Sequence, residues 1–306
     1  MIKANERLYR EWQRKRRSEG YAERPGNRTA LEQLEDFTGG RPLDELATGD
    51  IRDWVGSMDA MAPSTRLTYF GAARAFYNFL EDDEIIGRSP MHRMSQPKKP
   101  DRPVPIPPAE HCAALLDVTA KDRTPMGRRD HAMIRTMLDT GGPRATEIAT
   151  LLILGAAPRP RDVLGLDLDR DQITVIGKGD KTRTWPISPK TARSLSIWCR
   201  ARDKMRGADA PELWLGFRTK PGRVPTRALP RRVLEHRCGQ AGIPVIHPHQ
   251  LRHRSYHDFL DAGGTKQDAM VLYGWDSEVM PTYYASALRA ERAIRKGHTL
   301  AIGDKW

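Results

Sequence analysis

A proline-rich segment divides the chain. Residues 97–108 read PKKPDRPVPIPP, with six prolines in twelve positions. Because proline fixes φ and lacks a backbone N–H, this stretch can form neither a helix nor a central strand. We expect an extended linker at 97–108, with a domain at 1–96 before it and a larger one at 109–285 after it, followed by a tail at 286–306.

The first domain is predicted to be all-helical. Residues 5–18 contain no helix breaker, and further helices are expected to begin at Thr29 and Ser64, interpreted as N-caps. In the helix that Ser64 begins, apolar residues recur every three or four positions, which buries one face. Arg66 and Arg74 lie off that apolar stripe and are predicted to face solvent or a polyanion.

The second domain is predicted to be mostly helical with one small antiparallel sheet. Three segments with alternating apolar residues are joined by tight turns, as in a β-meander. These strand candidates are 163–169, 172–176 and 182–188. Helices are expected after the sheet, beginning near Thr191, Thr226, Pro248, Thr265 and Glu278. The predicted fold class is therefore mainly α: a helical bundle, a Pro-rich linker, and a mostly α domain with a three-stranded antiparallel sheet.

The charge of the chain points to a polyanionic partner. Lys and Arg number 51 and Asp and Glu number 39, which gives a formal net charge of +12 and a pI of about 9.8. Nucleic acid is the commonest polyanion bound by basic soluble domains. A basic, solvated surface without such a partner would give the same sum.

Membrane-spanning and secreted proteins are excluded by the apolar pattern. The longest apolar stretch, 148–157, has ten residues, whereas a bilayer span needs about 20. The first residues are charged and lack the apolar run of a signal peptide. Cys112, Cys199 and Cys238 are too widely spaced for a CxxC pair, and we interpret them as reduced core thiols of a cytosolic protein.

Two short motifs place a cation in a turn. In GGPRATEI (141–148), Arg144 begins a helix, where the helix dipole and the guanidinium suit a phosphate. In GKGDK (177–181), Lys178 lies at a hairpin tip, from which its amine can reach a phosphate or a leaving oxygen. Taken alone, each motif is more typical of an ordinary exposed side chain.

The segment HPHQLRHRSYH (247–257) allows two chemistries. His249 and Arg252 lie three apart on one helical face, where a histidine can move a proton and an arginine can hold a phosphate. The i, i+4, i+8 spacing of helical metal ligands is also present, in His249, His253 and His257. Only Asp258 lies nearby to complete a coordination shell, so the phosphate site is favoured.

Aromatic residues follow near the C-terminus. Trp275 comes after a helix-ending glycine in LYGW, and Tyr283 and Tyr284 lie in PTYYAS. A tyrosine can attack phosphorus when nearby cations stabilise its oxyanion. Taken alone, these aromatic residues are more typical of core packing.

Together, the order Arg, Lys, His-x-x-Arg, Trp, Tyr resembles the tyrosine recombinase (phage integrase) family. The resemblance covers nearly the whole chain, and HPHQLRH is its most specific motif. It implies that the catalytic residues are Arg144, Lys178, His249, Arg252, Trp275 and Tyr284. Trp275 occupies a position that is usually histidine, and the family spacing of nine residues selects Tyr284 over Tyr283. Pro143 and the extra segment 155–162 depart from the family pattern without removing a catalytic residue.

The resemblance implies a site-specific DNA recombinase that cleaves and rejoins strands through a 3′-phosphotyrosyl intermediate, without a metal or cofactor. We expect it to integrate and excise a phage or mobile-element genome in the bacterial host cytoplasm. The expected partners are double-stranded attachment sites, three further protomers in a tetramer on DNA, and accessory recombination proteins. Two alternatives stay open: a nicking-closing enzyme resembling type IB topoisomerases, and a non-catalytic DNA-binding protein on the same scaffold.

The resemblance also assigns roles to the domains. Residues 1–96 are expected to be a core-binding domain and 109–285 the catalytic domain. Because a helix begins near residue 5, no arm-binding domain is expected. The tail 286–306 either docks on a neighbouring protomer or is a solvated helix. The predicted DNA contacts are Arg66, Arg74, Lys98 and Lys99.

Overall fold

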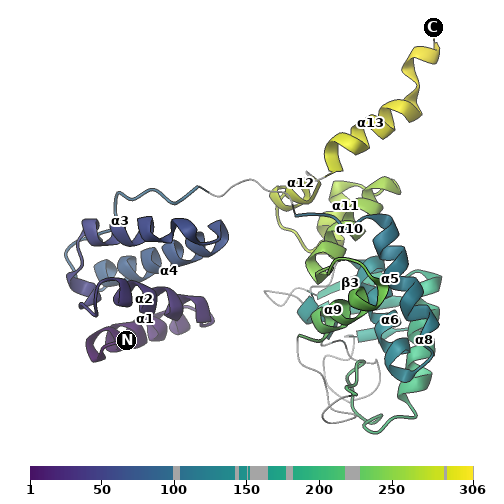
Figure 1. Ribbon diagram of the computed structural model, residues 1–306, viewed down its shortest axis with the longest axis horizontal. Helices are drawn as coiled ribbons and strands as arrows, with labels where there is room; N and C mark the ends of the chain where they lie inside the picture. Colours follow the sequence, from purple (N-terminus) through teal and green to yellow (C-terminus); the bar gives the residue numbers. More distant parts are fainter. Residues whose placement is uncertain are drawn as a thin grey trace. The chain divides into compact units, whose positions relative to one another are not determined.

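Two compact units make up the chain, Met1–Arg102 and Pro103–Trp306, called unit 1 and unit 2 below (Figure 1). The computed structural model describes residues 1–98, 104–141, 145–149, 151, 165–176, 182–217, 228–285 and 288–305. The prediction of a mainly α fold with a small three-stranded antiparallel sheet is confirmed. None of the described helices has both the length and the apolar content that crossing a bilayer requires.

Unit 1 is a helical bundle. Its elements are α1 (Lys3–Ser18), α2 (Pro25–Phe37), η1 (Leu43–Glu45), α3 (Thr48–Ser57), η2 (Met58–Ala60) and α4 (Pro63–Asp82). Trp12, Trp54 and Phe76 from three of these helices are buried in one core. The apolar stripe predicted on α4 therefore faces the other helices, as its period requires.

Two helices of unit 1 begin earlier than predicted. Thr29 is not an N-cap: α2 begins at Pro25, and the Thr29 hydroxyl donates to the Pro25 carbonyl at 3.3 Å. Ser64 is not an N-cap either, because α4 begins at Pro63. Proline suits the first turn of a helix, since its fixed φ is helical and its missing N–H would be unpaired there.

The sheet of unit 2 is an antiparallel meander. Strands β1 (Gly165–Asp167), β2 (Gln172–Ile176) and β3 (Thr182–Pro186) lie in the order β1-β2-β3. The register aligns Ile173 with Leu166 on one side and with Trp185 on the other. All three side chains are buried on one face, which gives the alternation of a half-buried sheet.

Helices cover this sheet and form the rest of unit 2. They are α5 (Ala109–Lys121), α6 (Pro125–Thr140), α7 (Ala145–Ala149), α8 (Pro189–Arg202), α9 (Leu229–Ala241), α10 (Pro248–Asp261), α11 (Lys266–Tyr273), α12 (Val279–Ala285), α13 (Arg289–Leu300) and η4 (Ile302–Lys305). The long helix α6 packs against α5, α8 and α10. Figure 1 shows α10, α11 and α12 close together, and contacts of α12 with both α10 and α11 join them.

The three cysteines are free thiols. Cys112 and Cys238 are buried and Cys199 is half-buried. Burial raises the pKa of Cys112 to about 11 and that of Cys199 to about 11. Protonated thiols in apolar surroundings are poor nucleophiles, so these residues act as core side chains.

Candidate active site

Four of the predicted catalytic residues lie together in unit 2. His249 and Arg252 come from the first turns of α10, Trp275 from the turn after α11, and Tyr284 from α12. Residues separated by 35 positions in sequence, His249 and Tyr284, are in direct contact. The predicted constellation is therefore a spatial cluster for these four residues.

The other predicted positions lie outside the described residues. These are Arg144, Lys178 and Lys99, together with the extra segment 155–162. Helix α7 begins directly after Arg144, and strand β3 begins four residues after Lys178.

The start of α10 places the histidine and the arginine. Pro248 occupies the first turn, and the His247 backbone N–H donates to the Gln250 side-chain oxygen at 2.8 Å. This hydrogen bond is one half of a capping box, which fixes the first residue of the helix. His249 and Arg252 are then three apart and lie on the same face.

The Tyr284 hydroxyl lies beside the His249 ring. The oxygen is 3.3 Å from Nε2 and 3.5 Å from Nδ1 of His249, and Tyr284 is only 2% exposed. His249 is exposed, but partial desolvation of its ring, and next the charge on Arg252, lower the pKa of its imidazole. A neutral imidazole at this distance can accept a phenolic proton.

His253 forms a second, buried wall of the site. Its ring is stacked on that of Tyr284, and the residue is 1% exposed. Neither ring nitrogen has a hydrogen-bond partner within the described part of the chain. Desolvation lowers the pKa of His253 to about 3, with smaller contributions from His249, His257 and Arg252. His253 is therefore neutral at physiological pH.

The Arg252 guanidinium is buried beneath the aromatic residues. Its Nη1 donates to the Gly141 carbonyl at 3.0 Å and its Nη2 to the Tyr273 carbonyl at 3.2 Å. Its central carbon lies 5.6 Å from the Trp275 ring centroid and 5.8 Å from that of Tyr284. Backbone oxygens and ring faces thus fix a cation within reach of the tyrosine.

An aromatic cluster holds α12 against α10 and α11. Trp275 lies 4.9 Å from Tyr284 and 5.3 Å from Tyr256, measured between ring centroids. The Tyr256 hydroxyl donates to the Pro281 carbonyl of α12 at 3.3 Å. Tyr283 is half-buried, whereas Tyr284 is enclosed by the cluster. Of the two tyrosines, Tyr284 is therefore the one whose hydroxyl contacts His249.

The three histidines of α10 do not form a ligand set. His253 is stacked on Tyr284, and His257 Nδ1 accepts a hydrogen bond from Arg292 of α13. Desolvation, and next the Arg292 charge, lower the pKa of His257 to about 4. Across the described ranges, no three His, Cys, Asp or Glu side chains come together as a metal site.

Sequence reasoning missed three residues that shape this site. They are His253, Tyr256 and Arg183, whose guanidinium contacts the Tyr273 carbonyl. The i+4 spacing of His253 from His249 predicts that both lie on the same face, which is the signal that could have found it. For Tyr256 and Arg183, no local pattern in the sequence indicates which distant segment they contact.

The predicted DNA contacts in unit 1 have intramolecular partners. Arg66 forms an ion pair with Asp59, and the Arg74 guanidinium donates to the Met94 carbonyl. Both arginines are half-buried rather than fully exposed, while Lys98 is exposed. Their contact with DNA stays a prediction.

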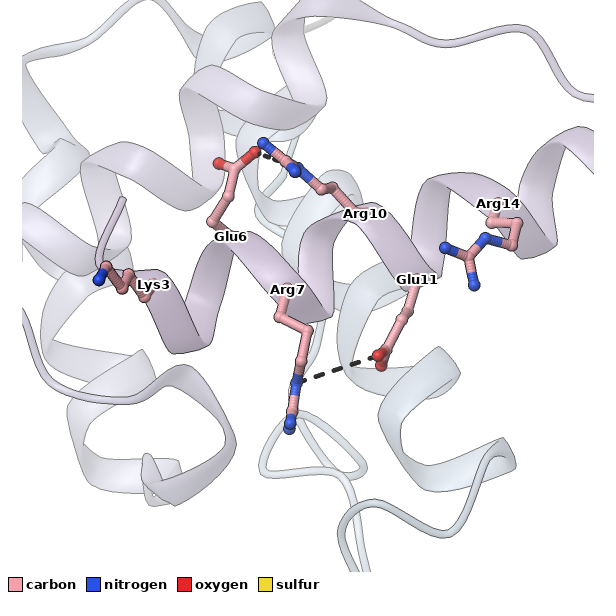
Figure 2. Close-up of a pocket in the computed structure, with 6 residues that line it drawn as sticks. All are labelled: Lys3, Glu6, Arg7, Arg10, Glu11 and Arg14. Carbon is pink, nitrogen blue, oxygen red and sulfur yellow. Dashed lines mark hydrogen bonds and ion pairs between the residues drawn. The ribbon is translucent and has the colours of Figure 1, made fainter.

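The exposed face of α1 carries a separate basic surface. Figure 2 shows a hollow along this helix lined by Lys3, Glu6, Arg7, Arg10, Glu11 and Arg14. Glu6 and Glu11 form ion pairs with Arg10 and Arg7. Four basic and two acidic side chains of one helix line this hollow, so its net charge is positive.

Known proteins share the sequence pattern. The profile of the phage integrase family matches residues 108–291, more than half of the chain. Tyrosine recombinase XerC of Chromohalobacter salexigens is 28% identical over 251 residues, covering 80% of this chain and 78% of the relative. Tyrosine recombinase XerC 1 of Ralstonia nicotianae is 29% identical over 260 residues, covering 82% and 78%.

Solved structures share the fold. XerH recombinase, in a post-cleavage complex with its palindromic difH substrate, has a TM-score of 0.68 at 17% identity, covering 87% of this chain and 77% of that one. The Tn1549 transposon integrase in complex with transposon right end DNA has a TM-score of 0.66 at 17% identity, covering 96% and 99%. With the family match over its second unit, the chain belongs to the phage integrase family and is a site-specific tyrosine recombinase.

Proposed function

We propose that Tyr284 is the nucleophile that cleaves and rejoins DNA. Its hydroxyl oxygen attacks a phosphodiester, forming an oxygen–phosphorus bond to the 3′ phosphate while the bond to the 5′ oxygen breaks. The phenolic proton passes to His249, and a proton is supplied to the leaving 5′ oxygen. The reverse reaction with a 5′ hydroxyl from another duplex reseals the strand without ATP.

The contact between Tyr284 and His249 carries this proposal. The 3.3 Å between the hydroxyl and Nε2 is within hydrogen-bonding reach for proton transfer. Partial desolvation and the Arg252 charge lower the pKa of His249, which favours the neutral ring that can accept that proton. The Arg252 cation, whose central carbon lies 5.8 Å from the Tyr284 ring centroid, favours the phenolate that the attack requires.

The remaining roles follow from charge. Arg252 and Arg144 bind the non-bridging phosphate oxygens and neutralise the charge that develops in the transition state. Lys178 protonates the leaving 5′ oxygen. Trp275, packed on Tyr284, donates its indole N–H to the phosphate.

We assign the larger assembly as follows. Residues 1–96 bind the core of the DNA site, 97–108 link the domains, and 109–285 carry out catalysis, with four protomers and accessory recombination proteins completing the complex. Tail residues Arg292 and Arg295 form ion pairs with Asp261 of their own chain. If the tail 286–306 docks in trans, Arg292 and Arg295 would instead pair with Asp261 of a neighbouring protomer.

We propose that the enzyme integrates and excises a phage or mobile-element genome, on DNA in the bacterial cytoplasm. The curated relatives carry the name tyrosine recombinase XerC, which favours a second candidate, recombination between chromosomal sites. Mapping the cleaved sequence in the source genome decides between them.

A nicked duplex that traps the covalent intermediate tests the proposal. The DNA site is first selected by binding from a random duplex pool. The wild-type chain and Tyr283→Phe are expected to form covalent product, Tyr284→Phe none, and EDTA to leave the reaction unchanged. Absence of covalent product from the wild type would leave only DNA binding. Relaxation of a supercoiled circle without strand exchange between duplexes would indicate a topoisomerase-like enzyme.

A further inference from the structure

Arg183 is a buried arginine outside the predicted catalytic set. It lies on β3, and its side chain is 8% exposed. Its Nη2 forms an ion pair with Glu147 Oε1 of α7 at 2.9 Å, and its Nη1 donates to the Tyr273 carbonyl at 2.9 Å. One guanidinium thus joins a strand, a short helix and the end of α11.

The Tyr273 carbonyl is shared by two arginines. It accepts hydrogen bonds from Arg183 at 2.9 Å and from Arg252 at 3.2 Å. A displacement of Arg183 therefore acts directly on an oxygen that holds Arg252. Since both donors are charged, each bond is of the stronger, charge-assisted kind.

The turn into Trp275 is shaped around the Arg183 side chain. Gly274 has a φ of +66°, and a Cβ at this position would lie 2.5 Å from Cδ of Arg183. A residue with a Cβ would be strained there by the left-handed conformation, and it would also displace the Arg183 side chain. Trp275 follows directly, so the Arg183 side chain limits how that turn can lie.

The other contact of Arg183 reaches toward the first arginine motif. Glu147 lies three residues after Arg144, and Arg183 lies five residues after Lys178. Burying an arginine–carboxylate pair contributes little net stability compared with apolar side chains of similar size. A contribution to the stability of unit 2 therefore does not explain why this pair is present.

We propose that Arg183 is a positioning residue of the active site. Together with Glu147 and the Tyr273 carbonyl, it holds the strand after Lys178, the helix after Arg144 and the turn into Trp275 in one arrangement. It touches no reacting atom. The inference rests on the proposed function, because it concerns the same site.

The test separates cleavage from binding. Single-turnover cleavage of the nicked duplex is measured at saturating protein, alongside the Kd for DNA and the melting temperature. Arg183→Met is expected to slow cleavage about 10²-fold, with Kd within about threefold, since small displacements of catalytic groups cost this much. Arg183→Lys keeps a positive charge opposite Glu147 but lacks the planar pair of nitrogen donors that reaches both Glu147 and Tyr273. This variant is expected to cleave faster than Arg183→Met but more slowly than the wild type.

Matched variants complete the design. Arg170→Met changes an exposed arginine of the same sheet and is expected to cleave at the wild-type rate. The double variant with Glu147→Gln and Arg183→Met is expected to cleave no more slowly than the slower of the two single variants. This follows because the two side chains act as one unit. The inference would be overturned if Arg183→Lys and Arg183→Met cleaved at the wild-type rate. It would also be overturned if their cleavage rates fell only in proportion to a loss of folded protein. A wild-type chain without covalent product instead overturns the proposed function.

Discussion

The imidazole of His253 lies flat on the phenol of Tyr284, with ring centroids 3.8 Å apart and planes 7° apart. This contact packs one buried ring against the ring of the proposed nucleophile. Because the His253 nitrogens are unpaired in the described structure, its shape rather than its hydrogen bonding supports Tyr284.

Substitution of His253 by phenylalanine is expected to preserve cleavage, and substitution by alanine to reduce it. Phe keeps a flat ring against Tyr284 and removes two buried, unpaired nitrogens, so the melting temperature should be equal or higher. Ala leaves a cavity, with a loss of about 3–5 kcal/mol by analogy with Phe→Ala changes, and frees the tyrosine ring. Covalent product on the nicked duplex should fall about tenfold or more in His253→Ala, and a slow Phe variant would contradict this reasoning.

Acid should destabilise the fold through buried histidines. The pKa of histidine in an unfolded chain is about 6.5, whereas burial lowers it to about 3 for His253 and to about 4 for His257 and for His131. Below pH 6.5 the unfolded chain binds protons that the folded chain does not, so stability is full above pH 6.5 and falls as the pH drops toward 3.

Calorimetry of the full chain between pH 7.5 and 4.5 checks this direction. The melting temperature should decrease over that range. His253→Phe should show a smaller decrease, because one of the lowered pKa values is removed. An unchanged decrease in the Phe variant would assign the effect to other groups.

The loss of cleavage caused by replacing Lys178 should be reversed by a substrate with a better leaving group. Lys178→Ala is expected to slow cleavage about 10²–10⁴-fold, the usual contribution of a general acid. With sulfur in place of the bridging 5′ oxygen, the leaving thiolate needs no protonation, so the variant should approach the wild-type rate. Arg252→Ala should stay slow with the sulfur substrate, since it acts on the non-bridging oxygens. Equal rescue of both variants would be inconsistent with the assigned roles.

The basic face of α1 should contribute salt-dependent binding. Arg14 is exposed, and each neutralised phosphate contributes about 0.9 to the slope of log K against log salt. Arg14→Gln should therefore lower that slope by about one and leave cleavage of bound DNA unchanged. Arg170→Gln, on the turn of the unit 2 sheet, serves as the matched control. Equal slopes for Arg14→Gln and the wild type would remove α1 from the DNA-binding surface.

Local sequence patterns predicted those features that local physics determines. Pro248 indicated the start of α10, and the period of two indicated the buried face formed by Ile173 and Trp185. These signals depend on backbone geometry and burial within a few residues.

Contacts between distant segments could not be predicted in this way. Arg74 lies off the apolar stripe of α4, yet it is half-buried because Met94 returns beside it. The spacing of His253 placed it on the face of His249 but did not identify Tyr284 as the ring against it. Arg183 shows the same limit, since its partners Glu147 and Tyr273 are 36 and 90 positions away.

Burial of Tyr284 also affects the fate of the linkage it would form. Tyr284 is 2% exposed, and its ring packs against those of His253 and Trp275, so a phosphoester formed there would be poorly accessible to bulk water. Hydrolysis would leave a permanent break in the DNA, whereas a 5′ hydroxyl of a duplex bound in the same complex would arrive already oriented. Under the proposed function, the aromatic enclosure of the tyrosine would protect the DNA from a cut that is not rejoined.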